Sequence, residues 1–136
     1  MPEKKEPLVR FEKKGDEIHV ATVLSDSVVN PLNVSEFSQE IAAYAKQHPK
    51  LVLILNFERV DYLSSSVLSE LLQIRKVVIE SGGQLRLCAI SDTIYEIFEI
   101  TNLNTMFTIH RDGVDADIKR YQRAKAVAEQ ESAWSE

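Results

Sequence analysis

The chain alternates between short apolar runs of strand length and longer segments in which apolar residues recur every three or four positions. A turn signal at Gly15-Asp16 separates the first two runs and predicts an opening hairpin. The almost entirely aliphatic run Leu51–Leu55 predicts an interior strand that is covered on both faces. The predicted strands are residues 9–12, 18–24, 51–55, 84–90 and 107–110.

Helical periodicity occupies the segments between most of these strands. A loop rich in Ser, Asp, Asn and Pro is predicted at residues 25–32, before the first helix, and Pro49 ends that helix. Residues 1–7 and 130–136 show no such periodicity and predict loose ends. The predicted helices begin at Asn33 or Ser35, at the serines 64–66, at Ser91 or Thr93, and at Val114, and the last helix ends at Ala128.

The helix after the three serines has the clearest amphipathic pattern. Its apolar positions form one face, and the opposite side is polar. We expect Leu72 to lie in the core, and the Gly82-Gly83 pair predicts the end of the helix. The predicted face has two flanks: one comprises Leu68, Leu71, Leu72, Arg75 and Ile79, and the other Val67, Leu71, Ile74 and Val78.

This order of elements predicts an α/β protein. After the opening hairpin, strands and helices alternate, which favours a mostly parallel central sheet with crossover helices packed on it. A length of 136 residues fits one domain, because a chain of this size buries roughly 68–70% of its unfolded surface. We therefore expect a single domain over residues 1–136, with a core at about 8–128 and flexible ends.

Composition disfavours several classes of function. A net charge of -5 disfavours a nucleic-acid partner. Cys88 is the single cysteine, so no internal disulfide is possible and a small buried side chain is expected. No apolar run has the length of a membrane span or secretion signal, so we expect a cytoplasmic protein without membrane insertion. His19, His48 and His110 lack the spacing of a metal site, and no metal or cofactor is expected.

Three consecutive serines, Ser64–Ser66, stand between the aliphatic strand and the next helix. The first backbone N–H groups of a helix lack intrahelical partners, and the helix macrodipole is positive at that end. Hydroxyl groups cap such a helix start well, and a phosphate group would be stabilised there. Capping alone is the simplest role for these residues, but this junction is where we expect the chemistry of the protein.

The stretch around these serines resembles the signature of the STAS family, small domains shared by sulfate transporters and anti-sigma factor antagonists. In that family a strand leads to an aromatic residue, an aliphatic residue, Asp, Ser, Ser or Thr, Gly and Leu. Here Ser64 replaces the Asp, and Val67 replaces the Gly. The other positions match: Tyr62 and Leu63 are the aromatic and aliphatic residues, Ser65 falls on the phosphorylated serine, Ser66 on the Ser or Thr, and Leu68 on the leucine.

A second stretch, after the strand at residues 84–90, also resembles this family. Asn102 stands where the family has a glycine after its helix. Asn tolerates the left-handed conformation that a helix C-terminus often needs, so we expect Asn102 to adopt it. The matching residues are Ile94, Ile97, Phe98, Glu99, Ile100, Thr101, Leu103, Met106 and Phe107. The resemblance extends over roughly residues 9–127 and implies the STAS fold.

The resemblance implies a regulatory binding protein and not an enzyme. In anti-sigma factor antagonists, a partner that is both anti-sigma factor and serine kinase phosphorylates the serine that Ser65 matches. The unphosphorylated form binds that partner and releases the sigma factor. A serine phosphatase is a further implied partner, and a weak homodimer is left open. The candidate phosphorylation sites are Ser65, then Ser66 and Ser64. The candidate partner-binding residues are Asp26, Tyr62, Ser64, Ser65, Ser66, Val67 and Ile94.

Other interpretations stay open. Asp26 resembles an acidic loop residue near the family's serine, but an aspartate bonded to its own backbone fits equally well. The absence of an Asp before Ser65 favours a STAS scaffold or partner subunit, in a stressosome-like or transporter-ATPase assembly, that is never phosphorylated. An enzyme with a serine nucleophile ranks far behind, because the chain lacks a G-x-S-x-G turn and a recognisable histidine partner.

Overall fold

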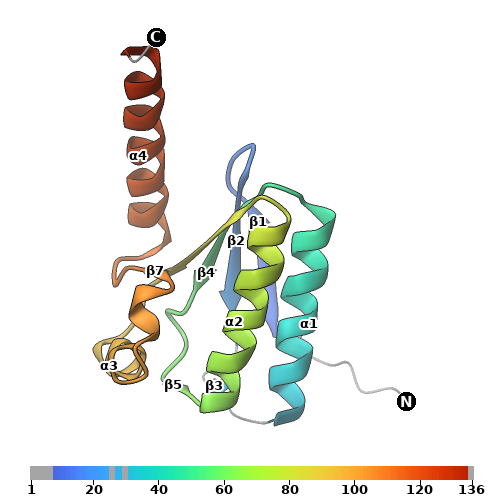
Figure 1. Ribbon diagram of the computed structural model, residues 1–136. Helices are drawn as coiled ribbons and strands as arrows, with labels where there is room; N and C mark the ends of the chain where they lie inside the picture. Colours follow the sequence, from blue (N-terminus) through green and yellow to red (C-terminus); the bar gives the residue numbers. More distant parts are fainter. Residues whose placement is uncertain (1–7, 25–26, 29–30, 135–136) are drawn as a thin grey trace.

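The computed structural model describes residues 8–24, 27–28 and 31–134. A sheet forms its centre, α1 and α2 lie side by side against one face, and α4 extends well beyond the sheet (Figure 1). The strands are β1 (Val9–Lys13), β2 (Ile18–Val23), β3 (Ser27–Val28), β4 (Val52–Asn56), β5 (Tyr62–Leu63), β6 (Gln84–Cys88) and β7 (Thr108–Ile109). The helices are α1 (Pro31–Gln47), α2 (Ser65–Glu80), α3 (Asp92–Ile100), the 3-10 turn η1 (Leu103–Thr105) and α4 (Val114–Trp134).

The central sheet has five strands in the order β1-β2-β4-β6-β7. The first pair, β1 and β2, is antiparallel. The pairs β2 with β4, β4 with β6, and β6 with β7 are all parallel. Parallel neighbours need crossover connections, which α1, α2 and α3 supply. The predicted α/β class, with an opening hairpin and a mostly parallel sheet, is therefore confirmed.

Most of the apolar core lies between the sheet and the pair of helices α1 and α2. Leu53 and Leu55 of β4 belong to one buried cluster with Phe37 of α1 and with Leu71 and Ile74 of α2. All five side chains are fully buried. Burial of one such side chain stabilises the fold by about 1.5–3 kcal/mol, so this layer supplies most of the stability.

The opposite face of the sheet carries a smaller apolar cluster beneath the first turns of α4. Strand residues that alternate with the main core point to this side, as the pleat requires. The cluster comprises Ile18, Val20, Val52, Ile54 and Cys88 from the strands and Tyr121 from α4, with Ala89, Val114 and Ile118 packed against it. Both faces of the sheet are therefore covered, but by unequal layers.

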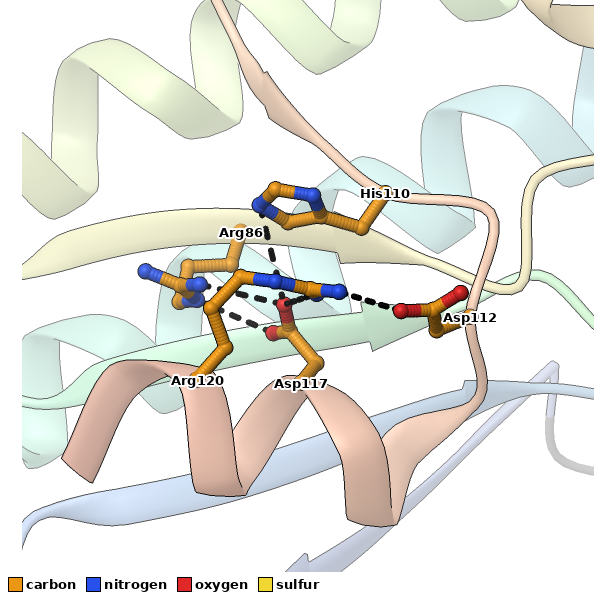
Figure 2. Close-up of polar contacts among 5 residues, drawn as sticks. All are labelled: Arg86, His110, Asp112, Asp117 and Arg120. Carbon is orange, nitrogen blue, oxygen red and sulfur yellow. Dashed lines mark hydrogen bonds and ion pairs between the residues drawn. The ribbon is translucent and has the colours of Figure 1, made fainter. Parts of the chain in front are cut away.

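A buried ion pair holds α4 against this second face (Figure 2). Arg86 of β6 donates from Nε and Nη2 to the carboxylate of Asp117 over 2.9 and 3.1 Å. Asp117 is fully buried and Arg86 is 8% exposed. Arg120 donates to Asp117 over 3.4 Å and also pairs with Asp112, while His110 Nε2 lies 4.0 Å from Asp117. Buried charges are stable only when paired and hydrogen bonded, so this cluster fixes the position of the helix.

The predicted loop at residues 25–32 is wrong in two respects. Residues 27–28 form β3, which pairs in parallel with β5 in a separate two-stranded sheet. The first helix begins at Pro31 and not at Asn33 or Ser35. Proline is favoured at the first helical position because its fixed φ is already helical and its missing N–H needs no partner there.

Three smaller expectations are also corrected or decided. The last helix continues to Trp134 and not only to Ala128, because Ala, Gln and Glu are good helix formers. Leu72 is partly exposed and packs against the edge of the main core. Ser91, and not Thr93, caps α3, since its hydroxyl accepts a hydrogen bond from the backbone N–H of Ile94 over 3.2 Å.

Backbone conformation explains why two helices end where they do. Gly82 has φ +83°, and a Cβ on Gly83 would lie 2.3 Å from the carbonyl oxygen of Leu51, so both positions need glycine. The predicted end of α2 is thus confirmed. Asn102 follows α3 with φ 61° and ψ 21°, which confirms the left-handed conformation expected of it.

Candidate functional site

The three serines lie beyond the end of β4, where the chain leaves the sheet for β5 and α2 (Figure 1). Asn56, the last residue of β4, is 4% exposed and donates to the hydroxyl of Thr22 over 3.4 Å. Its side-chain oxygen accepts from the backbone N–H of Glu58 over 3.1 Å. Leu63 is buried in the main core. The segment before the serines is therefore anchored at both of its ends.

The three serines occupy different positions at the start of α2. Ser64 is the N-cap, with an extended backbone, and its half-buried Oγ accepts from the N–H of Val67 over 3.3 Å. Ser65 and Ser66 are the first two helical residues, and both are exposed. None of the hydrogen bonds between described residues uses the Oγ of Ser65 or Ser66. The hydroxyl of Ser64 caps the helix. The hydroxyls of Ser65 and Ser66 are available for modification or for contact with a partner.

The start of α2 is electropositive. The backbone N–H groups of Ser65 and Ser66 precede the first intrahelical hydrogen bonds, and the first turn has no acidic side chain. A negative group in this position is stabilised by about 0.3–1 kcal/mol through the helix macrodipole. A phosphate on Ser65 would therefore be tolerated without unfolding the junction.

The structure tests whether the candidate partner-binding residues are accessible. Tyr62 is 52% exposed and accessible to a partner. Val67 and Ile94 are fully buried in the main core, so neither side chain is accessible to a partner in this structure. Asp26 lies outside the described residues. The β-strand residue next to it, Ser27, pairs with Tyr62.

Two exposed apolar side chains, one at the end of α3 and one just after η1, were not among the candidate contact residues. Ile100, at the end of α3, is 77% exposed, and Met106, after η1, is 42% exposed. The helix α3 packs beside β5, the strand that leads into the serines. The signal for Ile100 was available, because Ile94 and Phe98 already define the buried face of α3 and leave Ile100 off it.

The cysteine and the three histidines, which are the usual nucleophiles and bases in enzymes, make their contacts with residues other than the three serines. Cys88 is fully buried, and burial raises the pKa of its thiol to about 12, so it is not a thiolate at neutral pH. His19 Nδ1 lies 2.6 Å from the hydroxyl of Tyr44, and His48 Nδ1 donates to the carbonyl of the same residue over 2.9 Å. His110 faces Asp117.

Residues 23–116 match the model of the STAS domain family. Since the match covers more than half of the chain, the protein belongs to the STAS domain family. Within that family the similarity is to anti-sigma factor antagonists. BtrV of Bordetella bronchiseptica, which carries that name, is 32% identical over 82 residues, or 60% of this chain and 70% of BtrV.

Solved structures support the same fold. The anti-sigma factor antagonist SpoIIAA in its unphosphorylated form has a TM-score of 0.69 at 19% identity, with 84% of this chain and 96% of SpoIIAA covered. The phosphorylated form of Bacillus SpoIIAA gives 0.63 at 19% identity, over 83% and 98%. A variant of RsbS from Moorella thermoacetica gives 0.71 at 13% identity, over 87% and 97%.

Along the described part of the chain, no helix combines the length and the apolar content that a membrane span requires.

Proposed function

We propose that this protein is a phosphorylation-regulated anti-sigma factor antagonist that binds a kinase-type anti-sigma factor through the start of α2. The observation that carries the proposal is the position of Ser65. Its exposed hydroxyl is the first in α2, while the neighbouring Ser64 is used as the cap. Relatives that carry the name of anti-sigma factor antagonist support the proposed class of partner.

The proposed switch works by charge. A phosphate adds about -1.5 to -2 charges and three acceptor oxygens. The start of α2 stabilises that charge within the protein, so the fold is retained. A partner surface that accommodates a neutral hydroxyl is instead forced to bury a hydrated anion, which favours dissociation. A phosphatase would restore the binding form.

The proposed contact surface combines the serines with exposed apolar residues of β5, of α3 and of the segment after η1. Tyr62, Ile100 and Met106 are exposed, and α3 packs beside β5. Aromatic and methionine side chains are enriched in protein interfaces, and a few residues that become fully buried on binding carry most of the binding energy. These residues replace the buried Val67 and Ile94 in the proposed surface.

The first experiment is phosphosite mapping by mass spectrometry on the protein isolated from its own cells, in growth and under stress. Phosphate on Ser65 that varies with condition supports the proposal. Complete coverage of the peptide without phosphate under any condition contradicts it. Phosphate on Ser66 alone would move the switch by one residue and contradict the assignment to Ser65.

Binding to the cognate anti-sigma factor tests the mechanism. Ser65→Asp should weaken binding at least tenfold, Ser65→Ala should bind in the presence of the kinase activity, and Ser66→Ala serves as the matched control that remains switchable. Equal binding by all of these variants would contradict a charge switch. The surface is tested by Ile100→Asp, for which Ile79→Asp is the control: Ile79 is also exposed, at 48%, but lies near the far end of α2.

A non-phosphorylated STAS scaffold is the second candidate. It is favoured by one observation: Ser64 stands where the family signature has an acidic residue, and the first turn of α2 has no acidic side chain to replace it. A scaffold should bind its assembly equally well with Ser65→Asp and Ser65→Ala. Co-purification of the unmodified protein with a stressosome-like or transporter-ATPase complex would then identify it.

A further inference from the structure

The second half of α4 contacts the rest of the described chain through Lys125, which pairs with Glu17. Up to Tyr121 the helix is anchored by the small apolar cluster and by the Arg86–Asp117 pair. From Gln122 to Glu131 every residue is exposed, and this part of the helix stands away from the rest of the molecule (Figure 1). An isolated helical segment of this length is marginal in water, so a partner would stabilise it.

The charges of this segment run against the helix macrodipole. Basic residues precede acidic ones: Arg123 and Lys125 are followed by Glu129 and Glu131. The last turn has no basic side chain. Acidic groups near a helix C-terminus are destabilising, and Lys four residues before Glu is the less favourable order for such a pair. Lys125 is accounted for by its ion pair with Glu17, but the positions of Arg123, Glu129 and Glu131 are not explained by the stability of a single helix.

An antiparallel copy of the same helix would reverse the effect. Arg123, Val127 and Glu131 are spaced four residues apart and share one face. Val127 is 53% exposed at the midpoint, with one basic and one acidic residue equally far on either side. When two such faces meet antiparallel at Val127, Arg123 of each chain lies level with Glu131 of the other.

We propose that residues 122–131 of α4 bind the same segment of a second copy of this chain, antiparallel, with a two-fold axis beside Val127. Ala124 and Ala128 are small and allow the two helix axes to approach closely. The patch is symmetric about its own centre, as an isologous interface requires. Because the buried surface is small, association is weak and depends on protein concentration. The proposal is independent of the switch at Ser65.

Sedimentation equilibrium over a range of concentrations tests the contact. The wild type should dimerise reversibly, and Arg123→Glu or Glu131→Arg should each weaken the dimer by about tenfold, because attractive pairs become repulsive. An equimolar mixture of the two variants should dimerise as well as the wild type. Glu129→Arg is the matched control: it makes the same charge change but lies on a different face from Val127, and it should shift the dissociation constant by less than about twofold.

Two outcomes would overturn the proposal. One is a wild type that stays monomeric at all concentrations up to about 1 mM, the weak end of measurable association. The other is a control variant, Glu129→Arg, that weakens the dimer as much as Glu131→Arg does. Far-UV circular dichroism on every variant shows whether the fold is retained, which is expected because the changed residues are all exposed.

Cysteine cross-linking tests the orientation. Arg123→Cys and Glu131→Cys proteins, distinguished by mass, are mixed and mildly oxidised. An antiparallel pair should give mostly the mixed disulfide between the two variants. Mostly Arg123→Cys homodimers would show a parallel pair and overturn the proposal. The native Cys88 does not interfere, because it is fully buried.

Discussion

The two faces of the central sheet are held by different kinds of interaction. On the face covered by α1 and α2, large apolar side chains such as Phe37, Leu53 and Leu71 fill a continuous core. On the face covered by α4, a much smaller apolar cluster surrounds the buried pair of Arg86 and Asp117. The first layer depends on non-directional burial, whereas the second depends on two charges held in one geometry.

The apolar layer therefore contributes mainly to the stability of the fold, whereas the ion pair mainly determines the position of α4. Apolar packing tolerates many arrangements of similar volume, so it holds α1 and α2 against the sheet without depending on any single contact. A bidentate arginine and carboxylate pair is geometrically specific, so it fixes the position of the first turns of α4 against the sheet. This ion pair and the small apolar cluster around it therefore determine the direction in which the exposed second half of α4 extends.

The largest expected effect comes from breaking the anchor on one side only. Asp117→Ala leaves the guanidinium of Arg86 buried without its partner, and loss of one member of a buried pair costs about 3–5 kcal/mol. Chemical denaturation followed by far-UV circular dichroism measures the change in the free energy of unfolding. A cost below about 1 kcal/mol would show that the pair is no more than a surface ion pair.

Replacing both members sharpens the same comparison. Because apolar residues of similar volume often replace a buried ion pair without loss, Arg86→Met with Asp117→Leu should recover most of the stability lost by Asp117→Ala. If the double variant is as unstable as the single one, the remaining contacts of the cluster, to Arg120 and His110, require the carboxylate itself.

On the other face, one core leucine should cost slightly less. Leu71 is fully buried, and Leu71→Ala should destabilise the protein by about 2–5 kcal/mol. Leu72 is its matched control, since it follows directly on the same helix but is partly exposed, and Leu72→Ala should cost less than half as much. Equal losses in denaturant titrations would mean that this edge of α2 is as tightly packed as its centre.

The sequence was sufficient for the apolar layer because periodicity reports burial. The aliphatic run of β4 and the stripe of α2 both have the spacing of their secondary structure, and both elements appear where expected. Leu72 and Ile79, on one flank of the stripe, are exceptions, because the first is partly exposed and the second is exposed. The pairing of β3 with β5 was missed because each strand has two residues, which are too few to show an alternation of apolar and polar positions. The extension of α4 was missed because its exposed turns have no buried face to produce one.

The polar anchor had a weaker signal that could have been used. Arg86 interrupts a strand with apolar residues on both sides, Leu85 and Leu87. An arginine in an interior strand covered on both faces must have an anionic partner. The sequence alone does not say which acidic residue that is, because Asp112, Asp115 and Asp117 all follow within one short segment. Only the docking of α4 selects Asp117.

At the candidate site, the sequence predicted the junction but not which of its side chains are accessible. The three serines were placed at the start of α2 from the motif and from capping preferences, and Ser64 is the cap. The motif also pointed to Val67 and Ile94, which are buried. A family signature mixes residues that build a site with residues that contact a partner, and only burial in the folded chain separates them.

The smallest expected effect is the pH dependence of the free energy of unfolding, to which one histidine on each face of the sheet contributes. On the α1 face, burial, with smaller contributions from His48 and Lys13, lowers the pKa of His19. On the α4 face, burial and then Arg120 lower the pKa of His110, against an opposing effect of Asp117. In both cases the neutral imidazole is favoured in the folded state.

The direction of the pH dependence follows from this. The unfolded chain binds protons on both histidines below about pH 6.5, while the folded chain resists them, so stability falls as the pH falls from there toward the lowered folded values. The pKa values of the carboxyl groups of Glu12 and Glu17 are also lowered, but their contribution is lost only near and below pH 4.5. Burial raises the pKa of Glu40, which has the opposite effect on stability as the pH falls. Denaturation at pH 7.5 and 5.5 is therefore compared between the wild type and histidine variants, which share Glu40.

Single substitutions assign the loss to one face. His19→Gln can still reach the hydroxyl of Tyr44, which lies 2.6 Å from the His19 ring, and it should reduce the difference in unfolding free energy between the two pH values. His110→Gln is the matched control on the α4 face. Each substitution should flatten the profile, because burial favours the neutral imidazole at both positions. A profile that neither substitution flattens would show that the pH dependence comes from other groups.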